Sequence, residues 1–415
     1  MTPNETQRSA WLILGLGVLL HLACAWLRPM SEALFSDMAV NSLRANLIRD
    51  GVVDLQLSFQ SLGEPLVLAS IMQACRSHVG AIHAILTGLH IVAWVGGGLA
   101  MRTLCSAWGL SARGRTLCLL LYAAWLPSAL YSNLCLNESF GASLLLIGAA
   151  GWLEKKRTPA TFGALALGAA CLFRPNLMLF VGGLAMLSLA GLVRRHTAPE
   201  VAEGERRTGL WFAAFAAVSV ALAFGATKVV VPASQGLASS DGMNFYLSVA
   251  PVRGIQFPET GWVPVLNHLL FTDLEVADVD MTDRAYFFDK AFAYVRAHPL
   301  ETVVRWLRNT LESTGYRISY FPGFPGYNAW LIAFSLLSSA LTLVGVLHAV
   351  RRRALPVAQL TLLAGVTMWV TVMFFMGCPR SRFPFDGLFI VAGVAGLGSL
   401  KARFAGARSG PPTAS

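Results

Sequence analysis

Residues 80–101, GAIHAILTGLHIVAWVGGGLAM, form an apolar stretch that contains no Asp, Glu, Lys or Arg. About 20 apolar residues in a helix are enough to cross the hydrocarbon core of a bilayer. A helix satisfies its backbone hydrogen bonds internally, which a single segment surrounded by lipid must do. The stretch therefore predicts a membrane-spanning helix.

Comparable apolar stretches recur along the whole chain of 415 residues, of which 55% are hydrophobic and 13% charged. An ordinary soluble domain has about 25% charged residues, so this chain has too little charge to cover a soluble surface. The sequence predicts an all-α polytopic membrane protein with about ten transmembrane helices. They are expected at 10–27, 80–101, 116–132, 139–153, 160–173, 176–193, 209–231, 327–350, 356–376 and 384–400.

The net charge of +10 helps to orient these spans. With the N-terminus inside, 17 of the 32 basic residues fall on cytoplasmic segments, as the positive-inside rule requires. They are Arg8, Arg102, Arg113, Arg115, Lys155, Lys156, Arg157, Arg194, Arg195, Arg206, Arg207, Arg351, Arg352, Arg353, Lys401, Arg403 and Arg408. The charge therefore marks cytoplasmic loops, and we expect no nucleic-acid partner. Both termini are expected in the cytoplasm.

Residues 64–75, EPLVLASIMQAC, are apolar but too short to cross a bilayer. Counting them as a span would invert every later loop and place the basic clusters outside. We interpret them as an interfacial or re-entrant helix.

The predicted spans divide the chain into four parts. Residues 1–231 are expected to form a transmembrane module with a first outer loop at 28–79, and residues 232–325 an extracytoplasmic loop domain. Residues 326–400 are C-terminal spans, and 401–415 are a cytoplasmic tail.

Two helices are expected in the loop domain, at 283–297 and from Pro299 to about Gly315. In the second, apolar side chains share one face and charged side chains the opposite side. Such a helix lies on the membrane surface or packs on the outer domain. The apolar set is Leu300, Val303, Val304, Leu307 and Leu311; the charged set is Glu301, Arg305, Arg308 and Glu312.

Two acidic residues stand at outer ends of spans, where water and headgroups meet. Asp37 lies in FSDMAVN after the first span, and Glu138 lies in the turn SNLCLNESFGAS. Ser36 or Asp37 can simply cap a helix, and Asn137 can cap the helix in which Glu138 occupies the first turn. Alternatively, the two carboxylates share general-base work and orientation of an acceptor.

Three arginines lie at the same outer level: Arg174 in LFRPNLML, and Arg380 and Arg382 in GCPRSRFPFDG. Arginine binds phosphate oxygens through two parallel hydrogen bonds. Anchoring to lipid headgroups is the simpler role. Arg174 can also pair with Glu138, and Asp386 can neutralise one of the last two arginines.

Other chemistries have weaker signals. No nucleotide-binding glycine loop occurs, and Asp278-Val279-Asp280 is a lone D-x-D string in an acidic loop, so a nucleotide donor is not expected. The seven cysteines form no C-x-x-C pair and no cluster with histidine, so no zinc or haem site is predicted. His21, His83 and His90 are the main titratable groups within spans, and we interpret them as packing residues.

In this order, the motifs resemble those of the C-type-fold integral-membrane glycosyltransferases. That family includes protein O-mannosyltransferases and aminoarabinose transferases, which use polyprenyl-phosphate-linked sugars. The resemblance covers nearly the whole chain and rests on short motifs. They are FSDMAVNSLRANLIRDG, SLGEPL, NESF, Arg-Pro-Asn at 174–176, DRAYFFDKAFAYVRAHPLETVVRWLR and PRSRFPFDG.

The resemblance implies a seven-span module followed by an outer loop and three variable spans. It also implies that Asp37 is the general base, Glu138 a second acid, and Arg174, Arg380 and Arg382 the contacts of the donor phosphate. Glu64 falls in the substrate-binding Pro-Leu element, where some relatives have Lys-Pro-Pro. The last motif reads Arg382-Phe383-Pro384, where relatives often have Arg-Tyr before the proline.

The implied reaction moves a sugar from a polyprenyl-phosphate carrier to a hydroxyl of a glycan, lipid or protein. Asp37 takes the proton of an acceptor that attacks the opposite face of the sugar, so the configuration inverts. No cofactor is required for certain, and a divalent metal between Asp37 and Glu138 stays open because oxygen ligands leave no spacing signature. We expect these side chains to line one outer pocket.

Three other functions remain as alternatives. An oligosaccharide polymerase or ligase would use a polyprenyl diphosphate donor, and a lipid-linked sugar flippase or transporter would have a polar path through the bilayer. A non-enzymatic scaffold is the third.

Overall fold

The structure is a computed structural model. The described residues are 3–27, 37–52, 57, 60–76, 78–154, 156–196, 203–238, 240–249, 283–313, 327–374 and 381–408. Arg380 and the D-x-D string at 278–280 lie outside them.

The described residues are helical and contain no β-strand, so the prediction of an all-α polytopic membrane protein is confirmed. Six of the described helices are long and apolar enough to cross a membrane. The membrane-crossing segments are Gln7–Leu27, Val79–Ala107, Thr208–Val230, Ala333–Arg351, Pro356–Phe374 and Phe383–Ala402; shorter apolar helices cover Glu138–Leu153 and Leu177–Ala190.

Each of the ten predicted stretches coincides with helical structure. The long helices are α1 (Pro3–Leu27), α4 (Val79–Ala107), α7 (Glu138–Leu153), α8 (Arg157–Phe173), α9 (Leu177–His196), α10 (Glu203–Val230), α15 (Tyr327–Arg351), α16 (Pro356–Phe374) and α17 (Asp386–Arg408).

One predicted span is not a continuous helix. The stretch 116–132 divides into α5 (Ala112–Ala123) and α6 (Leu126–Tyr131). Pro127 has no backbone N–H to donate to the carbonyl of Ala123, and its ring would clash with that carbonyl in an unbroken helix. The predicted stretch is therefore helical but interrupted at residues 124 and 125, and after α6 the chain continues into a buried loop that carries candidate residues.

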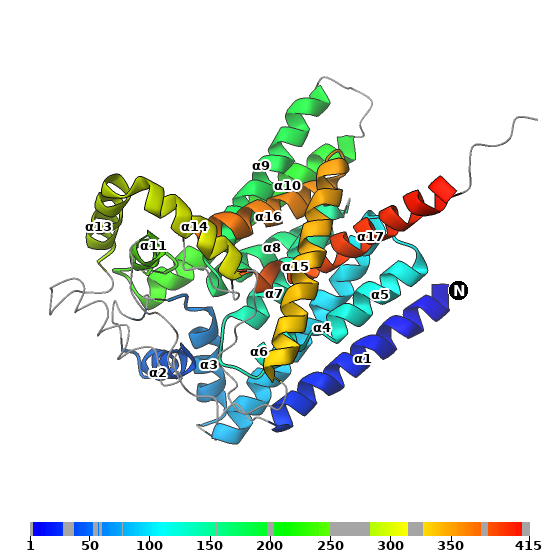
Figure 1. Cartoon of the computed structure of the whole chain (residues 1–415). Helices are drawn as coiled ribbons and strands as arrows, with labels where there is room; N and C mark the ends of the chain where they lie inside the picture. The colour runs from blue at the N-terminus through cyan, green and yellow to red at the C-terminus, as the bar shows by residue number, and fades with distance from the viewer. Residues whose placement is uncertain are drawn as a thin grey trace, which may run out of the picture.

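The shorter helices gather toward one end of the bundle. They are α2 (Asp37–Arg49), α3 (Gly63–Ala74), α11 (Asp241–Val249), α13 (Arg284–Ala297) and α14 (Pro299–Ser313). Figure 1 shows α2, α3, α11 and α13 at the left, with α14 leading back toward α16. The predictions for 283–297 and for a helix from Pro299 are confirmed, and Asp283 caps α13 by accepting from the Tyr286 N–H at 3.0 Å.

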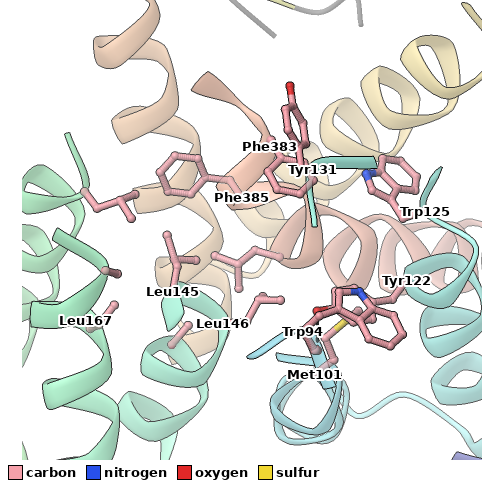
Figure 2. Packing of buried hydrophobic residues seen from close by; sticks show 14 of the residues in the cluster. Trp94, Met101, Tyr122, Trp125, Tyr131, Leu145, Leu146, Leu167, Phe383 and Phe385 are labelled. Atoms are coloured by element: carbon pink, nitrogen blue, oxygen red, sulfur yellow. Dashed lines mark hydrogen bonds between the residues drawn. The ribbon is translucent and has the colours of Figure 1, made fainter. Parts of the chain in front are cut away.

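Large side chains fill the middle of the bundle. Trp94 of α4 stacks on Tyr122 of α5 with ring centroids 5.1 Å apart. In Figure 2, Leu145 and Leu146 of α7 lie between this pair and Leu167 of α8. The same buried cluster includes residues from the first part of the chain and from α17, so the C-terminal helix belongs to one core with the N-terminal helices.

Small residues let α7 and α8 approach at backbone distance. A Cβ atom on Gly163 would lie 2.7 Å from the Cα of Gly151, closer than real contacts allow. Close approach of this kind is how helices pack in lipid, where the hydrophobic effect gives no preference for helix over lipid contact.

We expect Gly163→Ala to destabilise the protein by about 1–3 kcal/mol, because α7 and α8 must separate to admit the methyl group. The matched control is Gly182→Ala in α9, where an added Cβ meets nothing within 4 Å. Thermal unfolding of both variants in detergent checks this. Equal unfolding midpoints for the two variants would contradict the packing described.

Candidate active site

The loop between α6 and α7 is a buried connection that presents polar atoms to its neighbours. Residues 131–138 are all buried. The carbonyl of Cys135 accepts a hydrogen bond from Asn41 Nδ2 at 2.9 Å, and the carbonyl of Ser132 accepts one from His90 Nδ1, also at 2.9 Å. The loop thereby joins α2 and α4 at the point where α7 begins with Glu138.

Glu64 and His90 form a fully buried pair between α3 and α4. The Glu64 carboxylate oxygens lie 3.3 and 3.4 Å from His90 Nε2, and both side chains have no exposed surface. Because the Ser132 carbonyl can only accept, His90 Nδ1 carries a proton. A further proton must lie between Nε2 and the carboxyl group of Glu64. Burial raises the pKa of the Glu64 carboxyl, and the imidazole of His90 opposes that rise.

Glu138 is paired with Arg174 at the other side of the same cluster. Arg174 Nη1 lies 3.6 Å from Glu138 Oε1, and Glu138 is fully buried while the Arg174 side chain is 17% exposed. A Cβ on Gly141 would lie 2.8 Å from Arg174 Cγ, so glycine at this position allows the arginine to cross α7. The predicted pairing of these two residues is confirmed.

The backbone places Arg174 for this contact. Helix α8 ends at Phe173, and Arg174 adopts an extended conformation with φ −137° and ψ 90°. A residue before proline is disfavoured in helical geometry, so Pro175 ends the helix here. Residues 175 and 176 form a turn before α9 begins at Leu177.

Residues 60–64, which we call the bridging segment, connect the candidate residues. Gln60 Nε2 donates to Asp37 Oδ1 at 3.2 Å, and Ser61 Oγ donates to the Phe173 carbonyl at 2.7 Å. The Glu64 N–H donates to Asn137 Oδ1 at 3.0 Å. The segment therefore contacts Asp37, the end of α8 beside Arg174, and the residue before Glu138.

The contact between Glu64 and Asn137 corrects one expectation. Asn137 occupies the position before α7, but its side chain makes no capping hydrogen bond there. Its amide oxygen serves the backbone of α3 instead. The local sequence suggests a cap for α7 because sequence alone does not show that α3 begins against this loop.

Helix α2 is anchored by its polar face. Asp37, Asn41 and Arg44 are spaced four and three residues apart, so they share one side of the helix. Arg44 Nε donates to the Leu57 carbonyl at 2.9 Å, and Nη2 donates to the Gln60 carbonyl at 2.5 Å. Burial lowers the pKa of the Arg44 guanidinium to about 9, and the Asp37 carboxylate acts in the opposite direction. The face that holds the bridging segment thus also carries Asp37.

Arg382 lies in a separate buried network. Its Nε lies 3.4 Å from Asp386 Oδ1, with the arginine side chain 2% exposed, so the predicted neutralisation by Asp386 is confirmed. Trp125 Nε1 donates to Asp386 Oδ2 at 3.1 Å, and Arg382 Nη1 donates to Ser339 Oγ at 3.3 Å. These bonds connect α15 and α17 to the break between α5 and α6.

A cavity of about 20 Å³ lies between the two networks. Ser132 and Ser139 line it on one side, and Phe383 and Asp386 on another. This volume admits about one water molecule. It is too small for a sugar, and Asp37, Glu138 and Arg174 are not among its lining residues.

The structure thus brings together Glu64, Glu138 and Arg174, with Asp37 joined to them through the bridging segment. It places Arg382 in the neighbouring network. His90, Gln60 and Asn41 were not predicted as parts of the site. The sequence does mark His90, because it is a polar residue within an apolar span. Nothing in the sequence marks Gln60 or Asn41 as parts of the site. Within the described ranges, no three His, Cys, Asp or Glu residues group as a metal site requires.

We expect Glu64→Gln and His90→Gln each to lower the free energy of unfolding by about 1–3 kcal/mol, because each leaves a buried polar partner unmatched. The double variant should lose less than the sum of the single losses, since the two side chains contact each other. Unfolding in mixed micelles, followed by tryptophan fluorescence, measures all three. His83→Gln, two turns earlier in α4 and only partly buried, is the matched control. Additive single losses would show that the pair is not energetically coupled.

No protein-family model and no curated protein matches the chain. Among solved structures it is similar to the archaeal oligosaccharyltransferase AglB from Archaeoglobus fulgidus, in complex with an inhibitory peptide and a dolichol-phosphate, with a TM-score of 0.46 and 12% sequence identity. The match covers 96% of this chain and 51% of that one, so the chain spans about half the length of the structure it matches.

Proposed function

We propose that the chain is a membrane glycosyltransferase that moves a sugar from a polyprenyl-phosphate carrier to a hydroxyl acceptor on a glycan, lipid or protein. The observation that carries the proposal is the cluster of three acids and one arginine joined by the bridging segment. Of these acids, Glu64 and Glu138 are fully buried beside His90 and Arg174, and Asp37 is only half-buried. Asp37 is therefore the acid that an acceptor can reach.

Asp37 acts in this proposal as the general base. Its hydrogen bond from Gln60 holds the carboxylate at the start of α2, and its negative charge is favoured by the N-terminus of that helix. It takes the proton from the acceptor hydroxyl while the oxygen forms a bond to the anomeric carbon. The bond from that carbon to the phosphate oxygen breaks, and the carrier leaves as a polyprenyl phosphate.

Arg174 is the better placed of the two described arginines to meet the phosphate. The Arg174 side chain is more exposed than that of Arg382, and its Nη1 lies 3.6 Å from Glu138 Oε1, which is longer than a strong charged hydrogen bond. A guanidinium at the leaving group stabilises charge that develops as the bond breaks. Glu138 orients Arg174, Glu64 orients the bridging segment, and Arg382 supports the site through Asp386. Arg380, outside the described residues, remains a proposed phosphate contact.

The division of the chain follows the same proposal. Residues 1–231 form the catalytic module, 232–325 an extracytoplasmic loop domain and 326–400 the final spans, with 401–415 as a cytoplasmic tail. The catalytic cluster faces away from the cytoplasm in a bacterial inner membrane, so no nucleotide donor is used.

We expect Asp37→Asn to lower sugar transfer about 10²- to 10⁴-fold, since the amide cannot accept the proton. Purified full-length protein in proteoliposomes, supplied with labelled polyprenyl-phosphate sugars and a panel of acceptors, provides the assay. The matched control is Asp50→Asn just after the same helix, where an exposed carboxylate contacts Arg49 at 2.8 Å. Full transfer by a folded Asp37→Asn variant would remove Asp37 as the base.

The same assay separates the other activities. Transfer from polyprenyl diphosphate donors alone would indicate an oligosaccharide polymerase or ligase. Movement of the donor across the bilayer without covalent change would indicate a flippase or transporter. Both results would contradict the proposed reaction.

We expect Arg174→Lys to raise the KM for the donor and lower transfer by on the order of tenfold or more, because lysine keeps the charge beside Glu138 but loses the planar fork that binds phosphate. Arg157→Lys, at the opposite end of α8, is the matched control. Donor titrations for both variants measure the difference. An unchanged donor KM in Arg174→Lys would place the phosphate elsewhere.

A further inference from the structure

Helix α14 exposes its large aliphatic side chains and buries two uncharged polar side chains, Thr302 and Asn309. Leu300 and Leu307 are 82% and 57% exposed, whereas Thr302 and Asn309 are 1% and 8% exposed. A helix at a protein–water boundary shows the reverse arrangement. Exposed apolar side chains beside a buried polar face are expected where the outer surroundings are hydrocarbon.

The residues of α14 fall into three stripes. The helix turns by about 100° per residue, so Leu300, Val304 and Leu307 lie within one narrow sector. Glu301 and Arg308 occupy the next sector around the helix, and both are exposed. Thr302 and Asn309 occupy the third, which faces the protein. A helix that packs on a protein in water has two faces, one toward the protein and one toward water. A helix at a membrane boundary has a third face, toward lipid.

The third stripe fixes α14 at the end of a membrane-spanning helix. Trp306 contacts Phe374, the last residue of α16, with ring centroids 5.7 Å apart. Asn309 Nδ2 donates to the carbonyl of Ser248 in α11 at 3.3 Å. Helix α14 therefore lies at the level where α16 leaves the apolar core of the bilayer.

The exposed apolar surface of α14 continues that of α16. Val366 and Trp369 of α16 are largely exposed, as lipid-facing side chains of a span are, and Phe374 at its end is partly exposed. The apolar sector of α14 is also exposed over its length, up to Leu311. The Trp306–Phe374 contact holds the two helices against each other at this point.

We propose that α14 lies in the membrane interface, with Leu300, Val303, Val304, Leu307 and Leu311 inserted among the lipids of the leaflet where α16 ends. The charged stripe then faces headgroups and water, and the third stripe holds the protein. An amphipathic helix in this position buries its apolar face about 5–10 Å below the headgroups. The helix anchors the loop domain to the bilayer, and this inference does not depend on the proposed enzymatic activity.

Paired fluorescent labels test the insertion. Single cysteines are introduced by Leu307→Cys on the apolar stripe and Arg308→Cys on the charged stripe, each in a Cys75→Ser, Cys378→Ser background that removes two native thiols. Both proteins are labelled with bimane and placed in proteoliposomes. Quenching is then measured with shallow spin-labelled phospholipid and with aqueous iodide. Val304→Cys is a second probe of the apolar stripe, so the test survives poor folding of one variant.

We expect the labels at 304 and 307 to be quenched by the lipid probe at least about twofold more than the label at 308, with the opposite order for iodide. Strong quenching of all three by iodide alone would overturn the proposal. Protection of 304 and 307 from both quenchers would also overturn it, because a second copy or another protein would then cover the face.

Discussion

The contacts of the bridging segment, residues 60–64, constrain the rest of the candidate site. Ser61 holds the segment to the end of α8, and Glu64 holds it to α4 through His90 and to the loop before α7 through Asn137. Residues 60–62 of the segment lie outside any helix, so the side-chain bonds of Gln60 and Ser61 help to fix their path. Gly63 packs so closely on Phe173 that an added Cβ would lie 2.6 Å from its ring. Asp37 is positioned from the same segment through Gln60, which connects its location to that of Arg174 and Glu138.

The energetic consequence is a polar cluster that is costly to break. Removing one partner of a buried ion pair leaves an uncompensated charge in the protein interior, which is strongly destabilising. The fold therefore depends on the alignment of both pairs, Glu64–His90 and Glu138–Arg174. Small residues make that alignment feasible, because Gly141 admits the arginine and the glycines of α7 and α8 bring the helices to backbone contact. Stability and the proposed chemistry thus rest on the same few contacts.

Burying a charge in lipid is costly, so membrane-spanning segments are visible in the sequence as long apolar runs. Much of this architecture could therefore be predicted from the sequence. Helix ends with local causes were also predictable, such as the stop at Pro175 and the start at Pro299. The break between α5 and α6 was missed, since the apolar run hides the effect of Pro127. The candidate acids and arginines were recognisable as charges at span ends, and two of their pairings, Glu138–Arg174 and Arg382–Asp386, were foreseen. The Glu64–His90 pair and the capping of α3 by Asn137 depend on contacts between distant segments, which no local pattern encodes.

The proposed transfer requires that the cluster at the start of α2 and the end of α8 bind a lipid-linked phosphate. A cryo-electron microscopy map of the full chain in a lipid nanodisc with bound polyprenyl phosphate would locate that group. We expect phosphate density in contact with Arg174, on the side that faces Asp37, with the prenyl chain running along the apolar helices into the bilayer. Density at the opposite ends of the helices, beside Arg157 or Arg351–Arg353, would contradict this expectation.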